Sequence, residues 1–248
     1  WLIKSAALTL GVRPASIQEL YDAMGRGEYK GFTVPAVNIR GLSYDVARGM
    51  FRAAKKNNNG TFIFEIARSE IGYTEQPPAE YATVMIASAL KEGYKGPIFI
   101  QGDHYQVNAK KYSTDKDKEL SGLKKLIKDS ISAGFYNIDI DSSTMVDLSK
   151  SDLKEQQRLN YEIAADMTAY IRELQPKGVT VSVGGEIGEV GGKNSTAEEL
   201  KAFMDNYLNT LKKKGNLKGI SKISIQTGTT HGGVPLPDGT VAKVKLDF

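Results

Sequence analysis

The sequence predicts an α/β fold built on a parallel sheet. Six short runs of apolar and β-branched residues recur along the 248 residues, each followed by a segment with the apolar periodicity of a helix. Such runs are typical of strands buried on both faces, and strand–helix alternation makes neighbouring strands parallel. The predicted strands are residues 32–38, 61–66, 97–101, 137–141, 179–183 and 222–226.

Apolar residues spaced three and four apart predict the helices between these strands. One helix is expected over Val46–Ala54, a second over Leu120–Ile131 and a third over Leu159–Ile171. Thr196 and Glu199 have the spacing of a capping box and predict a helix that continues to Leu211. Residues 14–24 predict a short helix before the first strand.

Polar residues stand at the carboxyl end of nearly every predicted strand. A barrel assembles its site from many strand ends, whereas an open doubly wound sheet concentrates it at one switch point. No G-x-G-x-x-G follows the first strand, which counts against a dinucleotide fold. We therefore predict a (β/α)8 TIM barrel. The strand-end residues are Asn38, Glu65, Asp103, Asp141, Glu186 and Thr227.

The chain ends at Phe248 with six of the eight strands of such a barrel. The expectation is a single (β/α)-barrel domain over residues 1–248 that is incomplete at its carboxyl end and not active by itself.

The composition indicates which classes of binding partner to expect. The net charge is +4, but the lysines stand beside acids in helix-like segments, which favours solvated helix faces over a nucleic-acid surface. A modest positive field would favour anionic, phosphorylated substrates. The absence of cysteine excludes disulfides and thiolate metal sites. No apolar run reaches the roughly 18 residues of a membrane span, and we expect a cytoplasmic protein without membrane or nucleic-acid partners.

The two histidines of the chain, His104 and His231, both follow predicted strands, on the face where barrels do chemistry. An imidazole there can ligate a metal, and the neighbouring Asp103 can bind a substrate hydroxyl or move a proton. Each histidine alone is more typical of a structural role, but the pair together favours a catalytic divalent metal.

Two further segments carry acids near strand ends. Residues 184–192 hold five glycines and suggest a mobile loop that closes over a ligand, with Glu186 able to reach the barrel mouth. Asp139 and Asp141 share one side of their strand, either inside the barrel or beneath the helices. Asp141 is expected inside, near the top, and Asp139 is a candidate buried structural acid.

Six motifs in order resemble the class II, metal-dependent fructose-bisphosphate and tagatose-bisphosphate aldolases, from about Gly31 to Phe248. They are Val34-Pro35-Ala36-Val37-Asn38, Gly102-Asp103-His104, Ile138-Asp139-Ile140-Asp141-Ser142-Ser143, Gly185-Glu186-Ile187-Gly188 with Gly191-Gly192, Gly228-Thr229-Thr230-His231-Gly232, and Lys245-Leu246-Asp247-Phe248.

The resemblance implies a Zn²⁺-type metal that polarises a ketose carbonyl and stabilises the enediolate of dihydroxyacetone phosphate. His104 and His231 match two metal ligands of the family, and Glu186 matches a glutamate beside the metal. Asp103 matches the aspartate that exchanges a proton with the hydroxyl at the cleaved bond.

The resemblance also implies where substrate is held. Asn38 and Asp141 are expected to bind substrate. Gly192, Gly228 and Gly232 resemble positions whose backbone approaches the substrate phosphate and a bound monovalent cation.

The sequence departs from the family pattern at several points. The third metal histidine of the family follows a seventh strand, beyond Phe248. The loop over residues 191–195 lacks the glutamate that follows the family's Gly-Gly, and the lysine usual after the His-Gly turn is absent from residues 234–239. Glu65, where a small turn is usual, is a candidate replacement acid.

The resulting prediction is a lyase that cleaves a phosphorylated ketose such as fructose 1,6-bisphosphate into dihydroxyacetone phosphate and an aldehyde. The resemblance further implies a homo-oligomer. The alternative is an aldolase-like subunit that binds sugar phosphate without turnover, which the missing loop acid motivates.

Overall fold

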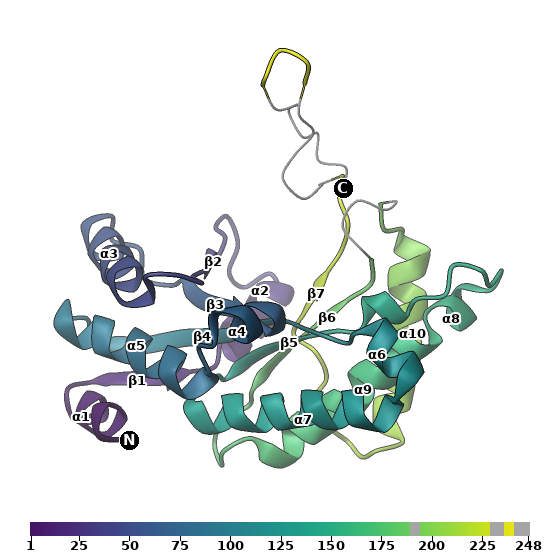
Figure 1. Ribbon diagram of the computed structural model, residues 1–248, viewed down its shortest axis with the longest axis horizontal. Helices are drawn as coiled ribbons and strands as arrows, with labels where there is room; N and C mark the ends of the chain where they lie inside the picture. Colours follow the sequence, from purple (N-terminus) through teal and green to yellow (C-terminus); the bar gives the residue numbers. More distant parts are fainter. Residues whose placement is uncertain (189–193, 229–235, 241–248) are drawn as a thin grey trace. The chain divides into compact units, whose positions relative to one another are not determined.

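The computed structural model describes residues 1–188, 194–228 and 236–240 (Figure 1). These residues group into two compact units. The first comprises Trp1–Tyr105, Ser121–Asp139 and Tyr170–Val183, and the second comprises the described parts of Gln106–Leu120, Ile140–Ala169 and Gly184–Phe248. Whether the chain forms the predicted single domain stays a prediction, and each unit is described by itself.

The strands are β1 (Val12–Ala15), β2 (Ala36–Asn38), β3 (Ile63–Ala67), β4 (Gly96–Gln106), β5 (Asn137–Asp141), β6 (Ser182–Glu186) and β7 (Lys222–Ser224). The α-helices are α1 (Leu2–Thr9), α2 (Gln18–Gly25), α3 (Ser43–Lys56), α4 (Arg68–Thr74), α5 (Pro78–Lys91), α6 (Ala109–Thr114), α7 (Lys116–Ala133), α8 (Leu153–Gln156), α9 (Arg158–Leu174) and α10 (Ala197–Lys212). None of these helices is both long and apolar enough to cross a membrane.

Sheet topology confirms the α/β prediction. The strands are hydrogen-bonded in the order β2-β3-β4-β5-β6-β7, and β1 pairs with β4. The pairs whose register is described (β1–β4, β2–β3, β3–β4 and β6–β7) are all parallel. A doubly wound sheet reverses its strand order at a switch point, whereas this order follows the chain, as in a barrel. The count of eight strands stays a prediction.

Every predicted strand overlaps an observed one. Residues 137–141 coincide with β5, whereas β6 begins three residues later than the predicted 179–183. The first predicted strand, residues 32–38, shortens to Ala36–Asn38. The ends of strands depend on where the neighbouring strand offers partners, which periodicity alone does not reveal.

The prediction of a helix over residues 14–24 is wrong at its start. Val12–Ala15 form β1, which pairs in parallel with Gly96–Phe99, and α2 begins only at Gln18. The side chain of Asn137 fixes this turn, because its Oδ1 accepts from the Ile17 backbone N–H at 2.8 Å and its Nδ2 donates to the Ala15 carbonyl at 3.2 Å. The strand therefore depends on partners 80 or more residues away in the sequence.

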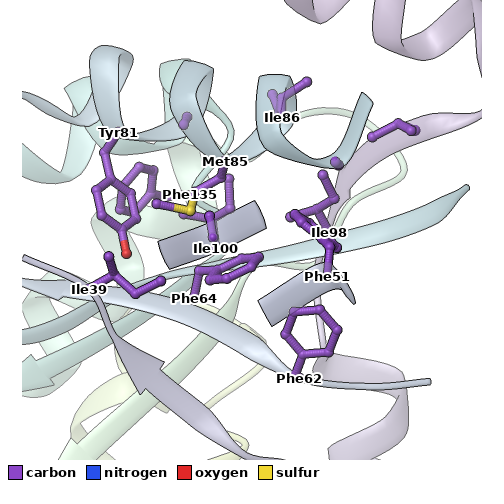
Figure 2. Packing of buried hydrophobic residues seen from close by; sticks show 14 of the residues in the cluster. Ile39, Phe51, Phe62, Phe64, Tyr81, Met85, Ile86, Ile98, Ile100 and Phe135 are labelled. Atoms are coloured by element: carbon purple, nitrogen blue, oxygen red, sulfur yellow. The ribbon is translucent and has the colours of Figure 1, made fainter. Parts of the chain in front are cut away.

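The first unit has one apolar and one polar sheet face. Alternate residues of β3 and β4 point to the helices, where the Phe51 ring of α3 lies 5.6 Å from Phe62 and 5.2 Å from Phe64 (Figure 2). Helices α3 and α5 pack together over this face. The register then places Asn38, Glu65 and Gln101 in one row. Residues in one row of a parallel sheet point the same way, so these polar side chains share the face opposite the core.

The second unit packs α9 and α10 against the start of the loop after β6. Its apolar cluster includes Tyr161, Phe203, Tyr207 and Ile187. The predicted capping box is confirmed: Thr196 Oγ1 accepts from the Glu199 N–H at 3.2 Å, and Glu199 Oε2 accepts from the Thr196 N–H at 2.9 Å. These bonds satisfy backbone donors that the first helical turn leaves without partners.

Candidate active site

A reversal of side-chain alternation in β4 shapes the first part of the site. Regular alternation would place Gly102 and His104 on the helix face and Tyr105 on the polar face. Instead, the buried Tyr105 ring lies against Gly102, and its hydroxyl is 2.6 Å from Ser130 Oγ on α7. His104 has the left-handed φ of 41° at the reversal. This is the effect of a β-bulge, which re-aims side chains beside functional sites.

Asp103 and His104 consequently lie side by side at this bulge. Asp103 Oδ1 is 3.6 Å from His104 Nε2, and the side chains are 18% and 47% exposed. Burial raises the pKa of Asp103 to about 6; His104 opposes this shift, Asp139 and Glu70 add to it, and a hydrogen bond from Asn38 lowers the pKa again.

Asn38 is held by residues that sequence reasoning missed. Its Nδ2 donates to Glu70 Oε2 at 2.7 Å, and its Oδ1 accepts from Arg40 Nε at 3.1 Å. Glu70 is buried, accepts from the Ala67 N–H at 2.8 Å and pairs with Arg40 Nε at 2.9 Å. A glutamate at the third position of a helix, as in Ala67-x-x-Glu70, is the pattern that would have identified α4 and this acid.

Glu65 lies in the middle of β3 rather than at its end. Its Oε2 accepts from Gln101 Nε2 at 2.7 Å, and its backbone carbonyl accepts from the Tyr81 hydroxyl at 2.8 Å. Burial, with Asp139 and then Glu65, raises the pKa of Tyr21 to about 12. Glu65 is aligned with Gln101, whereas Asp103 aligns with Ala67 two residues further along the strands. Glu65 therefore lies one layer below Asp103 on the polar face.

The second unit holds a buried carboxylate at the end of β5. Asp141 Oδ2 accepts from Gln106 Nε2 at 2.6 Å, and its Oδ1 accepts from the Ser143 N–H at 3.1 Å and the Ser143 hydroxyl at 2.7 Å. Bonds to both oxygens fix the plane of this carboxylate.

Glu186, the last residue of β6, is also buried. Its backbone carbonyl accepts from Asn160 Nδ2 at 2.8 Å, and Asn160 in turn accepts from the Ser142 hydroxyl at 2.7 Å. This chain of bonds ties the end of β6 to the residue after Asp141. One carboxylate oxygen of Glu186 lies within 4.8 Å of one of Asp141.

Asp141 and Glu186 are thus two buried carboxylates of the second unit that could hold a metal ion together. Carboxylates are ligands that zinc and related divalent metals accept. Glu186 was predicted as a metal ligand and Asp141 as a substrate-binding residue, and His104, the other described metal-ligand candidate, belongs to the first unit.

Several predicted site residues lie outside the described residues. These are His231, Gly192 and Gly232. Gly228 is described and has a φ of 91°, a conformation that favours glycine. Close to it in sequence, Gln226 exchanges hydrogen bonds with Ser195: its N–H donates to Ser195 Oγ at 2.9 Å and its carbonyl accepts from the Ser195 N–H at 3.0 Å.

Family comparison agrees with this arrangement. The model of the class II fructose-bisphosphate aldolases matches residues 18–248, and the chain belongs to that family. The search of curated proteins found no match.

One solved structure shares the fold, and a second gives a weaker match. A probable tagatose 6 phosphate kinase from Sinorhizobium meliloti 1021 matches with a TM-score of 0.63 at 16% identity, over 86% of this chain and 53% of that chain. The carboxyl transferase domain of pyruvate carboxylase from Rhizobium etli, with 3-bromopyruvate, matches with a TM-score of 0.41 at 12% identity, over 77% of this chain and 26% of that chain. The chain thus spans about half the length of the first of these structures.

Proposed function

We propose that this protein is a metal-dependent aldolase that cleaves a phosphorylated ketose, such as fructose 1,6-bisphosphate, into dihydroxyacetone phosphate and an aldehyde. The observation that carries the proposal is the Asp103–His104 pair on the β4 bulge, in a chain of the class II aldolase family. The left-handed conformation of His104 brings an acid and an imidazole side by side near the end of β4.

The metal ligands that the sequence predicts are His104, His231 and Glu186, and the buried Asp141 carboxylate near Glu186 is a further candidate. A divalent metal such as Zn²⁺, when bound, would supply Lewis-acid polarisation of the ketose carbonyl. The hydrogen bonds to both Asp141 oxygens hold that side chain in one orientation, as the partners of metal-ligating carboxylates commonly do.

Asp103 is the proposed proton acceptor at the cleaved bond. In the cleavage direction, its carboxylate takes the proton of the hydroxyl whose oxygen becomes the aldehyde carbonyl, and it returns that proton in synthesis. Asn38 orients this carboxylate through its hydrogen bond, and the buried Glu70 orients the Asn38 amide. The chain of contacts thus fixes the position of the base before substrate arrives.

Glu65 is the proposed acid for the C–H proton of the three-carbon fragment. It faces the same side of the sheet as Asp103, and Gln101 fixes one of its oxygens. The absence of an acid in residues 191–195 supports this assignment. Glu65→Gln should then abolish exchange of that proton with solvent, measured by tritium or deuterium incorporation into dihydroxyacetone phosphate.

The direct test is a retro-aldol assay of the full-length protein on fructose and tagatose bisphosphates, before and after chelation. Activity should disappear with the metal and return when Zn²⁺ is added. Asp103→Asn should lower kcat by at least about 100-fold, the size of a general-base contribution. Undiminished turnover after complete metal removal would sink the mechanism.

A second candidate function is binding of a sugar phosphate without turnover. The missing loop acid favours it, whereas the Asp103–His104 pair argues for catalysis. Metal analysis of the purified protein separates the two: stoichiometric metal with no lyase activity on any bisphosphate would favour the binding role.

A further inference from the structure

Arg40 follows β2 by two residues and stands beside the proposed base without being used by it. Its side chain is 56% exposed. Within the described part of the chain, the polar contacts of the guanidinium are made by Nε. This atom donates to Asn38 Oδ1 at 3.1 Å and pairs with Glu70 Oε1 at 2.9 Å. The outer edge of the guanidinium, with its two Nη atoms, therefore has no protein partner among these residues.

Other arginines of the first unit have different hydrogen-bond partners. Arg26 commits both Nε and Nη2 to the two oxygens of Glu28, a bidentate pair on the surface. Arg48 and Arg52 both bind Glu92. Arg40 alone of these four is held at Nε by a buried carboxylate, and Glu70 is itself fixed by the Ala67 N–H and the Asn38 amide.

This anchoring orients the guanidinium plane. A guanidinium held at Nε presents its two Nη donors as a fork that matches two oxygens of a phosphate. Glu70 is buried, so the pairing has a structural value of its own. By holding the guanidinium in one orientation, it also reduces the side-chain entropy that Arg40 loses when it binds an anion.

We propose that Arg40 binds a phosphate group of the substrate. Asn38 connects phosphate binding by Arg40 with proton transfer by Asp103, because its Oδ1 accepts from Arg40 and its side chain also hydrogen-bonds Asp103. A phosphate at Arg40 would thus lie two side chains from the base and would fix the sugar relative to it. The cation also offsets the repulsion that Glu70 and Asp103 exert on an anionic substrate. This inference rests on the proposed function for the identity of the substrate but not for the binding of phosphate.

The first test measures binding in the metal-free protein, so that no activity is needed. Inorganic phosphate and fructose 1,6-bisphosphate are titrated by calorimetry into the wild type, Arg40→Gln and Arg40→Lys. Loss of charge-assisted hydrogen bonds should weaken binding by about 10-fold to 100-fold in Arg40→Gln, and Arg40→Lys should lie between the two. Arg26→Gln, a substitution of an exposed and carboxylate-paired arginine, is the matched control and should bind as the wild type does.

The second test separates this role from a structural one. In the active protein, Arg40→Gln should raise KM for the bisphosphate and leave kcat within about threefold, because uniform binding is lost. A fall in kcat at unchanged KM, or binding equal to that of the wild type, would overturn the inference. Arg40-dependent phosphate binding in a protein without lyase activity would refute the proposed function and leave this inference standing.

Discussion

Substitution of Gly102 by alanine tests the bulge that presents Asp103 and His104. A methyl group at this position would overlap the Tyr105 ring, whose Cε1 and hydroxyl oxygen would lie 2.5 and 2.8 Å away. The ring is completely buried and its hydroxyl is bound to Ser130, so it has no space into which to move. Gly102 does not have a positive φ, so the expected effect is steric and not conformational.

The expected loss in the free energy of unfolding has two contributions. Overpacking a tight core typically costs about 1–3 kcal/mol, and a ring displacement that breaks the Tyr105–Ser130 bond leaves a buried polar group unsatisfied, at about 1–3 kcal/mol. We expect Gly102→Ala to lower the free energy of unfolding by about 2–5 kcal/mol, which corresponds to about 5–15 °C in Tm for a chain of this size. Because the ring fixes the bulge, the affinity for Zn²⁺ should fall as well.

Thermal unfolding followed by circular dichroism measures this loss. Gly49→Ala is the control: nothing lies within 4 Å of an added Cβ in α3, so the change should be neutral or stabilise by up to about 1 kcal/mol. Tyr105→Ala makes room for the methyl group, and the double variant should therefore be more stable than the sum of the single effects predicts. Strict additivity, or a Gly102→Ala protein as stable as the wild type, would refute the steric reasoning.

Three further predictions concern other elements. Thr196→Ala removes the capping bond to the Glu199 N–H and should cost about 1 kcal/mol in denaturant unfolding; an unchanged midpoint would contradict the role of the cap. Glu92 has its pKa lowered from 4.5, first by the Arg48 hydrogen bond, so its contribution is present above that pH and is lost as the pH falls through the lowered pKa. Glu92→Gln should therefore lower Tm at pH 7 and have little effect at pH 3, and an equal effect at both would exclude this linkage. Finally, removal of bound metal should lower Tm if the metal binds the native state alone, and Glu186→Gln should reduce that difference; no shift on chelation would argue against a bound metal.

Local sequence patterns were sufficient to predict most of the strands and helices of the fold. The apolar runs located six strands, and the Thr196–Glu199 spacing located the start of α10. These features depend on residues within a few positions of one another, and the period of a strand or the geometry of a cap is visible in the sequence itself. The Gly102-Asp103-His104 motif was predicted to follow the third strand, but β4 continues to Gln106 and contains it.

Features that depend on distant partners were decided only by the tertiary structure. β1 forms because β4 and the Asn137 side chain satisfy its backbone, although Pro14 resembles the start of a helix. The bulge at His104 depends on the bond between Tyr105 and Ser130, which are 25 residues apart in the sequence. Arg40 and Glu70 are 30 residues apart and become partners only when β2 and β3 pair. The sequence thus determined which residues are candidates for the site, whereas long-range hydrogen bonds and packing determined how the described ones are aimed, because such contacts leave no periodic pattern in the chain.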